Sequence, residues 1–101
     1  MLRCLGIKNV YKIEFTREMK KNAKLMQRRG KNMDKLTKVL DLLSKGETLP
    51  ANYYDHQLSG NLNDLRECHI EPDWLLIYQI HDDILVLTAT GTGTHADLFG
   101  K

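Results

Sequence analysis

Three short apolar segments lie close together in the second half of the chain, and their spacing constrains the fold more than any other feature. They span residues 65–70, 75–81 and 84–90. The connections between them are only a few residues long, and Asp82 and Asp83 form the second turn. Connections of that length join antiparallel strands, since parallel neighbours need a crossover of a dozen or more residues. The segments therefore predict an antiparallel meander.

The first half of the chain carries one strand pattern and two helix patterns. Residues 11–15 alternate apolar and polar side chains, as a half-buried strand does. Thr16 and Asn32 are suitable N-caps for helices at 17–28 and 33–44, and Gly30 and Gly46 are suitable stops. Apolar residues recur on one face of each helix, at Met19, Ala23 and Met26, then at Met33, Leu36, Val39, Leu40 and Leu43. We therefore expect an α+β fold of order β-α-α-β-β-β, with a helical hairpin packed on one face of a small antiparallel sheet.

The length of 101 residues suits one domain, which we place at 11–101 after an N-terminal extension at 1–10. The longest apolar run, 74–77, is too short to span a membrane, and the first ten residues lack the apolar core of a secretory signal. Cys4 and Cys68 form neither a disulfide framework nor a zinc-binding CxxC pair. We therefore expect a cytoplasmic protein in which Cys68 is a free, buried thiol.

Charge is distributed unevenly along the chain. Residues 1–50 hold 13 Lys and Arg against 5 Asp and Glu, a balance of +8, whereas residues 51–101 hold 2 against 8, a balance of −6. Basic side chains on the two predicted helices suit contacts with a polyanion, whose affinity would come mainly from phosphate neutralisation. The alternative is that these side chains form ordinary solvated helix faces.

Four polar side chains are candidates for chemistry. His69 lies on the first strand of the meander, and Asp73 lies in the connection that follows it. Alternation along that strand places His69 and Glu67 on the uncovered face of the sheet. His56 belongs to the long connection at 49–63, and His95 follows the last strand, so one concave patch can collect these groups. Each residue alone also has a structural explanation, as a solvent-exposed histidine or a turn aspartate.

Together these residues suit RNA cleavage. A base must take the proton of the 2′-hydroxyl and an acid must protonate the leaving 5′-oxygen, and imidazole does both near neutral pH. A carboxylate such as Asp73 can orient an imidazole, and Phe99 can stack on a nucleobase. A metal site is the chemical alternative because His and Asp are also ligands, but no HxH or HxxxH pair supports it.

The chain resembles the YafQ branch of the RelE/ParE superfamily of bacterial toxins. Three stretches carry the resemblance: 54–60 (YDHQLSG), 66–78 (RECHIEPDWLLIY) and 92–99 (TGTHADLF). The resemblance implies an mRNA interferase that cuts mRNA on the translating ribosome by 2′-hydroxyl attack, without metal or cofactor. It places His56, His69, Asp73, His95 and Phe99 at active-site positions, with His69 or His56 as base and His95 as acid. It also implies a cognate antitoxin, of the ribbon-helix-helix type, through which the complex binds its operator DNA, and it strengthens the interpretation of the basic helices as a ribosomal-RNA contact surface.

One departure from the family concerns phosphate binding. Many relatives carry an arginine just ahead of the Thr-Gly-Thr-His block, where this chain has Gly91, and no arginine follows Arg66. The departure keeps open a second function, a translation inhibitor that binds RNA or the ribosome without cutting. A gyrase-poisoning activity, as in the ParE branch, is disfavoured because it has no need of an acid–base pair.

Overall fold

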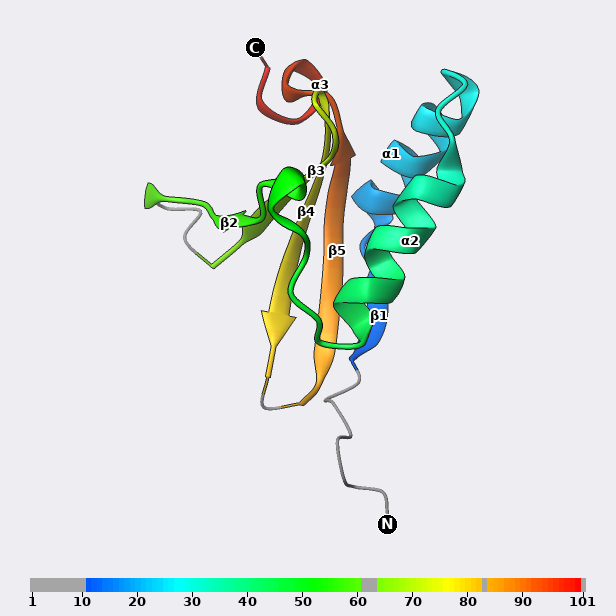
Figure 1. Cartoon of the computed structure of the whole chain (residues 1–101). Coiled ribbons are helices and arrows are strands. Elements are labelled where there is room, and N and C mark those ends of the chain that lie inside the picture. Colours follow the sequence, from blue (N-terminus) through cyan, green and yellow to red (C-terminus); the bar gives the residue numbers. More distant parts are fainter. Residues whose placement is uncertain (1–10, 61–63, 83, 101) are drawn as a thin grey trace.

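A computed structural model describes residues 11–60, 64–82 and 84–100 of the chain. The predicted N-terminal extension with Cys4, part of the connection at 49–63, and Asp83 of the predicted turn lie outside the described residues. The elements, drawn in Figure 1, are β1 (Lys12–Phe15), α1 (Arg17–Arg28), α2 (Met33–Ser44), the 3-10 helix η1 (Ala51–Tyr53), β2 (His56–Gln57), β3 (Arg66–Glu71), β4 (Trp74–His81), β5 (Val86–Gly93) and α3 (His95–Phe99).

The strands form one five-stranded sheet in the order β1-β5-β4-β3-β2. The meander β3-β4-β5 is antiparallel, as expected, and the α+β fold class is confirmed. The sheet as a whole is mixed, because β1 pairs with β5 in parallel, with Ile13 opposite Leu87. Two helices, rather than a tight turn, connect β1 to the meander, so no local geometry fixes the direction of β1. The antiparallel expectation was wrong for this one pair.

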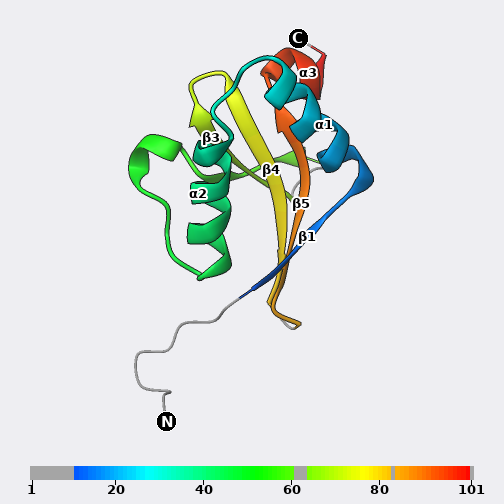
Figure 2. The same cartoon turned by 90° about the vertical axis from the view of Figure 1, so that its right-hand side faces the viewer.

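Both long helices begin and end where their capping residues predict. The Thr16 hydroxyl accepts a hydrogen bond from the Met19 N–H (3.0 Å), and the Asn32 side chain accepts one from the Asp34 N–H (3.0 Å). The two helices pack on one face of the sheet (Figure 1), and the view onto that face shows them in front of the strands (Figure 2). None of the helices in the described ranges is long and apolar enough to cross a membrane.

The core lies between the helices and the sheet. Met19, Met26 and Val39 from the helices meet Trp74 and Tyr78 from β4, all nearly inaccessible to solvent. Other apolar side chains complete this core, including Leu36, Leu43, Leu76 and Leu87. Cys68 is a free thiol buried in it, and burial, with the charges of Asp55 and Glu67, raises the pKa of Cys68 to about 12.

Three features near the ends of the sheet differ from the sequence expectations. The connection at 49–63 contains η1 and the two-residue strand β2, which pairs with β3 at the sheet edge. Strand β5 continues to Gly93, three residues beyond its predicted end. The tail after it forms α3, whose Thr94 and Asp97 make a capping box. These short elements depend on contacts with the rest of the fold, so their local sequences predict them weakly.

Candidate active site

The register of the sheet brings the site together at one end of the meander. Leu75 on β4 pairs with His69 on β3 and with Gly93 on β5. His69 and the start of α3, where His95 is the first residue, therefore flank the same point of β4. Asp73 lies in the tight β3–β4 connection beside them. Residues separated by more than twenty positions in the chain thus share one end of the sheet.

Asp73 holds His95 in a fixed orientation. Its Oδ1 is 3.0 Å from His95 Nδ1 and accepts a second hydrogen bond from the backbone N–H of His95 at 3.2 Å. The hydrogen bond from the His95 side chain, then the one from its backbone, lowers the pKa of Asp73, and the nearby charge of Lys31 adds to the effect. Asp73 is therefore a carboxylate that directs Nδ1 toward itself and leaves Nε2 of His95 free to face the site.

Glu67 lies at the centre of the histidine cluster and was not among the predicted site residues. Its Oε1 is 3.5 Å from His69 Nε2 and 3.4 Å from His56 Nε2, and its side chain is only 7% exposed. The other ring nitrogen of each histidine meets a backbone carbonyl: His56 Nδ1 is 2.7 Å from Tyr54 O, and His69 Nδ1 is 3.3 Å from Pro72 O. The signal that finds Glu67 is its place two residues before His69 on the same strand face.

Aromatic rings border the cluster on both sides. The ring of Phe99 is 6.4 Å from that of His95, and the ring of Tyr54 meets His69 edge-on at 5.6 Å. The rings of His69 and His95 are themselves 5.8 Å apart. Exposed Tyr54 has a positive φ of 49°, and sequence reasoning missed it although it begins the 54–60 stretch. A cavity of about 760 Å³ opens here, lined by Asn52, Tyr54, His56, His69, Ile70, Glu71 and Pro72.

The helix α3 that carries His95 is fastened to α1. Arg29, just after α1, binds the Asp97 carboxylate through two nitrogens, at 2.6 and 3.0 Å. Asp97 also accepts the Thr94 N–H at 2.9 Å. The Arg29 hydrogen bond, followed by the one from Thr94, holds the pKa of Asp97 well below its usual range. The contact therefore fixes the position of His95 relative to the helical layer.

The structure brings together all five predicted site residues, His56, His69, Asp73, His95 and Phe99. His81 lies at the opposite end of β4, opposite Val86, and is not part of this cluster. The catalytic roles of the five stay predictions.

The comparisons with known proteins agree with this fold. The family described as "Bacterial toxin of type II toxin-antitoxin system, YafQ" matches residues 11–100. The fold and this match place the chain in the class of type II toxin–antitoxin toxins. Within that class, the chain belongs to the YafQ family, and the resemblance seen in the sequence is confirmed.

Individual relatives match nearly the whole described region. The mRNA interferase toxin YafQ of Escherichia coli K12 is 45% identical over 89 residues, which cover 87% of this chain and 95% of that protein. The toxin in the crystal structure of the E. coli DinJ–YafQ toxin–antitoxin complex has a TM-score of 0.82 and 44% identity, covering 89% of this chain and 98% of that one. A crystal structure of a metal-bound toxin from Helicobacter pylori has a TM-score of 0.83 and 37% identity, covering 89% and 99%.

Proposed function

We propose that this toxin is a cytoplasmic mRNA interferase, an endoribonuclease that cleaves mRNA on the ribosome without a metal ion. The observation that carries the proposal is the pair His69 and His95, whose rings lie 5.8 Å apart on two sides of one open site. That separation lets one phosphodiester contact both imidazoles. The 45% identical relative bears the name mRNA interferase, which supports the same activity.

In the proposed reaction His69 is the base and His95 is the acid. His69 takes the proton of the 2′-hydroxyl, and the 2′-oxygen attacks the adjacent phosphorus to form a 2′,3′-cyclic phosphate. The bond to the 5′-oxygen breaks, and that oxygen receives a proton from His95. The carboxylate of Asp73, 3.0 Å from His95 Nδ1, stabilises the imidazolium that donates the proton. His69 is assigned as the base because its ring lies between those of His56 and His95.

The aromatic border and the cavity support placement of the substrate. The exposed rings of Tyr54 and Phe99 offer stacking surfaces to the bases on either side of the scissile phosphate. His56, held against Glu67, positions the phosphate from the β2 edge. The charge that the resemblance assigns to an arginine at position 91 would come here from Lys31, which lies in the joint between α1 and α2 and is the cation that acts on Asp73.

The partners follow from the family. The E. coli relative forms a complex with its antitoxin DinJ, which supports a cognate antitoxin for this toxin as well. We propose that this antitoxin is of the ribbon-helix-helix type, that it carries the complex to operator DNA, and that the free toxin acts on the ribosome and its mRNA. Residues 11–101 would constitute the toxin domain and residues 1–10 an extension to it.

Alanine substitutions at the two histidines test the proposal. We expect His69→Ala and His95→Ala each to lower cleavage of a translated message by about 10² to 10⁴-fold, the usual contribution of general acid–base catalysis. His81→Ala is the matched control, since it removes a histidine at the far end of β4 and should leave cleavage unchanged. Primer extension on mRNA from translating ribosomes gives the readout.

Two outcomes would redirect the assignment. Growth arrest with intact mRNA, unaffected by either histidine variant, would identify a non-cleaving translation inhibitor, the function that Gly91 keeps open.

Metal independence needs a test of its own, because a similar toxin from Helicobacter pylori has been crystallised with a bound metal. Toxin that is stripped with EDTA and then freed of the chelator should still cleave ribosome-bound mRNA, and a loss of cleavage that added metal restores would contradict metal independence.

A further inference from the structure

Asp55 lies between two residues that line the cavity at the site, Tyr54 and His56, and takes no part in the proposed reaction itself. We infer that Asp55 is a positioning residue, whose carboxylate fastens this segment to the buried hydroxyl of Tyr78 and to Arg66. The three side chains are called the Asp55 anchor below. The structural half of this inference stands on geometry alone, whereas the effect of the anchor on cleavage rests on the proposed function.

The segment that carries Tyr54 and His56 has little regular structure to hold it. Strand β2 consists of His56 and Gln57 alone, and the 3-10 helix before it has three residues. Tyr54, which follows that helix, has a φ of 49°, in the left-handed region that residues other than glycine rarely adopt. Tyr54 and His56 are both exposed, so burial fixes neither of them. A two-residue strand is unstable by itself, so the position of the segment depends on a contact elsewhere.

The Asp55 carboxylate makes that contact through both of its oxygens. Oδ1 accepts a hydrogen bond from the hydroxyl of Tyr78, a β4 residue that is fully buried in the core. Oδ2 lies 3.3 Å from Arg66 Nη2 on β3. Burial, and after it the hydrogen bond to Asp55, raises the pKa of Tyr78 well above its usual range, so the hydroxyl keeps its proton and acts as a donor. Asp55 is therefore tied to two strands of the sheet at once.

The sheet register explains how Asp55 and His56 reach opposite faces. Arg66 pairs with Tyr78, and Glu67 pairs with His56. Successive residues of a strand point to opposite faces of a sheet. Arg66 and Tyr78 therefore lie on the core face, whereas Glu67 and His56 lie on the face of the site. Asp55 continues this alternation, so its carboxylate can be held from the core side while its neighbour faces the site.

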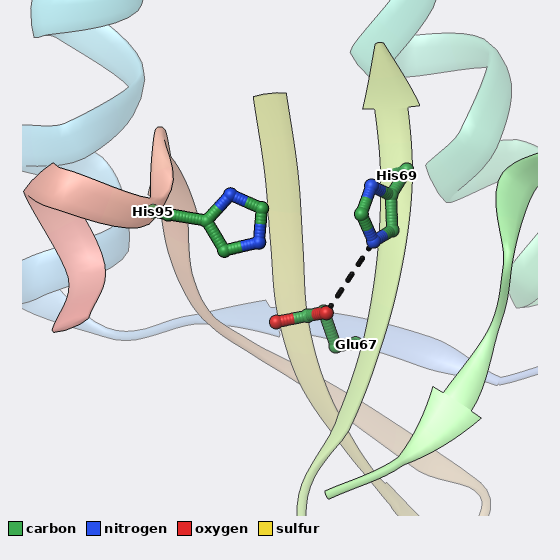
Figure 3. A group of neighbouring side chains, drawn as sticks. All are labelled: Glu67, His69 and His95. Atoms are coloured by element: carbon green, nitrogen blue, oxygen red, sulfur yellow. Dashed lines mark ion pairs between the residues drawn. The ribbon is translucent and has the colours of Figure 1, made fainter. Parts of the chain in front are cut away.

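Tyr54 and His56 both contact the histidine cluster. Figure 3 shows Glu67, His69 and His95 of this cluster together on the face of the site. His56 Nε2 lies 3.4 Å from Glu67 Oε1, and the Tyr54 ring meets His69 edge-on at 5.6 Å. Groups in an active site lose much of their effect when they shift by about 1 Å. The Asp55 anchor therefore determines how well this side of the site is placed.

Asp55→Ala and Tyr78→Phe test the effect on cleavage. We expect Asp55→Ala to lower the single-turnover cleavage rate at saturating ribosomes about tenfold, because Tyr54 and His56 are displaced. Tyr78→Phe removes only the hydroxyl and leaves the contact with Arg66, so it should act in the same direction by a smaller factor. Affinity for the ribosome should not change, because neither substitution touches the basic helices.

A positioning role predicts a dependence on Tyr54 and His56 that a general loss of stability would not show. In a Tyr54→Ala/His56→Ala background, the anchor has no aromatic side chain left to position. Adding Asp55→Ala to that background should therefore lower the rate no further, although it lowers the rate of the parent. An equal fall in both backgrounds would overturn the role of Asp55 as a positioning residue.

The chain supplies a matched control in a second tyrosine–aspartate pair. The hydroxyl of Tyr11, a buried residue, donates to Asp82, which follows β4 at the end away from the site. Tyr11→Phe and Asp82→Ala remove the same chemical groups as the anchor variants. Both should cleave at the parent rate. Circular dichroism and thermal midpoints compare the fold and stability of the two pairs of variants.

Nuclear magnetic resonance tests the structural half without a cleavage assay. The rings of His56 and His69 are 6.4 Å apart, so their facing protons are close enough for nuclear Overhauser cross-peaks. These cross-peaks should weaken in folded Asp55→Ala and Tyr78→Phe and persist in Tyr11→Phe. If Asp55→Ala does not fold, Tyr78→Phe alone decides both arms.

The outcomes separate this inference from the proposed function. Cross-peaks between His56 and His69 that stay unchanged in the folded anchor variants would overturn the anchor. Weakened cross-peaks in a chain whose parent never cleaves RNA would contradict the proposed function and leave the anchor standing.

Discussion

Gly91 shows at the scale of a single residue how closely α1 packs against β5. A Cβ at position 91 would lie 3.2 Å from Asn22 Oδ1 and 3.4 Å from Leu98 Cδ2. The Asn22 oxygen already accepts the Thr92 N–H at 3.2 Å, so it cannot move freely. The α1–β5 contact is therefore packed around a missing side chain. Beyond the contact lies a cavity of about 320 Å³ that Phe99 also lines, which leaves room for a longer group.

Restoring arginine at this position should increase activity at a cost in stability. We expect Gly91→Arg to raise the single-turnover cleavage rate on the order of tenfold, because a guanidinium near Phe99 adds charge that stabilises the transition state. The tight contact should lower the free energy of unfolding by about 1–3 kcal/mol. Gly91→Ala is the control: it brings the steric cost and no charge, so its rate should not rise. An unchanged rate in a folded Gly91→Arg protein would mean that the lysines and histidines already supply the charge required.

At the scale of elements, the sequence predicts the helices and strands whose own residues specify where they begin and end. Helices α1 and α2 were predicted with their observed bounds because Thr16 and Asn32 cap them through local hydrogen bonds. The short elements β2 and α3 were missed, since two strand residues and a five-residue helix are unstable without tertiary contacts. The histidines were found because their chemistry is distinctive. Strand alternation placed Glu67 on the same face as His69, but Glu67 was missed as a site residue because only the sheet pairing shows that His56 also lies beside it.

The Arg29–Asp97 contact should matter more for activity than for stability. We expect Arg29→Ala to leave the thermal midpoint nearly unchanged, because exposed ion pairs contribute little to folding. It should nevertheless lower cleavage on the order of tenfold, because α3 would fray and misplace His95. Hydrogen exchange of the amides at 94–100 should speed up in parallel. Arg17→Ala, which removes one exposed arginine from the start of α1, is the control, and an equal loss of cleavage in both variants would refute the role of α3 anchoring.

At the scale of the whole molecule, the fold separates charge between its layers. The helical layer comes from the basic half of the chain, and the β2–β5 part of the sheet comes from the acidic half. The basic and acidic halves meet in ion pairs at Glu71, which binds Lys31 of the α1–α2 joint at 2.9 Å and Lys35 of α2 at 2.8 Å. Lys31 also lies 5.9 Å from the centre of the Trp74 ring. The basic layer thus borders the histidine site, although the chain as a whole has a net charge of only +2.

The α1 basic surface, formed by exposed Lys21, Lys24 and Arg28 around one shallow hollow, should bind the RNA of the ribosome. Replacing all three with Ala should weaken ribosome binding and reduce the slope of log affinity against log salt by about 0.7 to 0.9 for each phosphate that the variant no longer neutralises. The cleavage rate at saturating ribosomes should not change, because the histidines lie on another surface. The control replaces three other exposed lysines with Ala: Lys12 on β1, Lys38 on α2 and Lys45 just after α2. It removes the same number of positive charges as the first triple variant. Equal weakening in both triple variants would show that net charge, and not the α1 basic surface, drives binding.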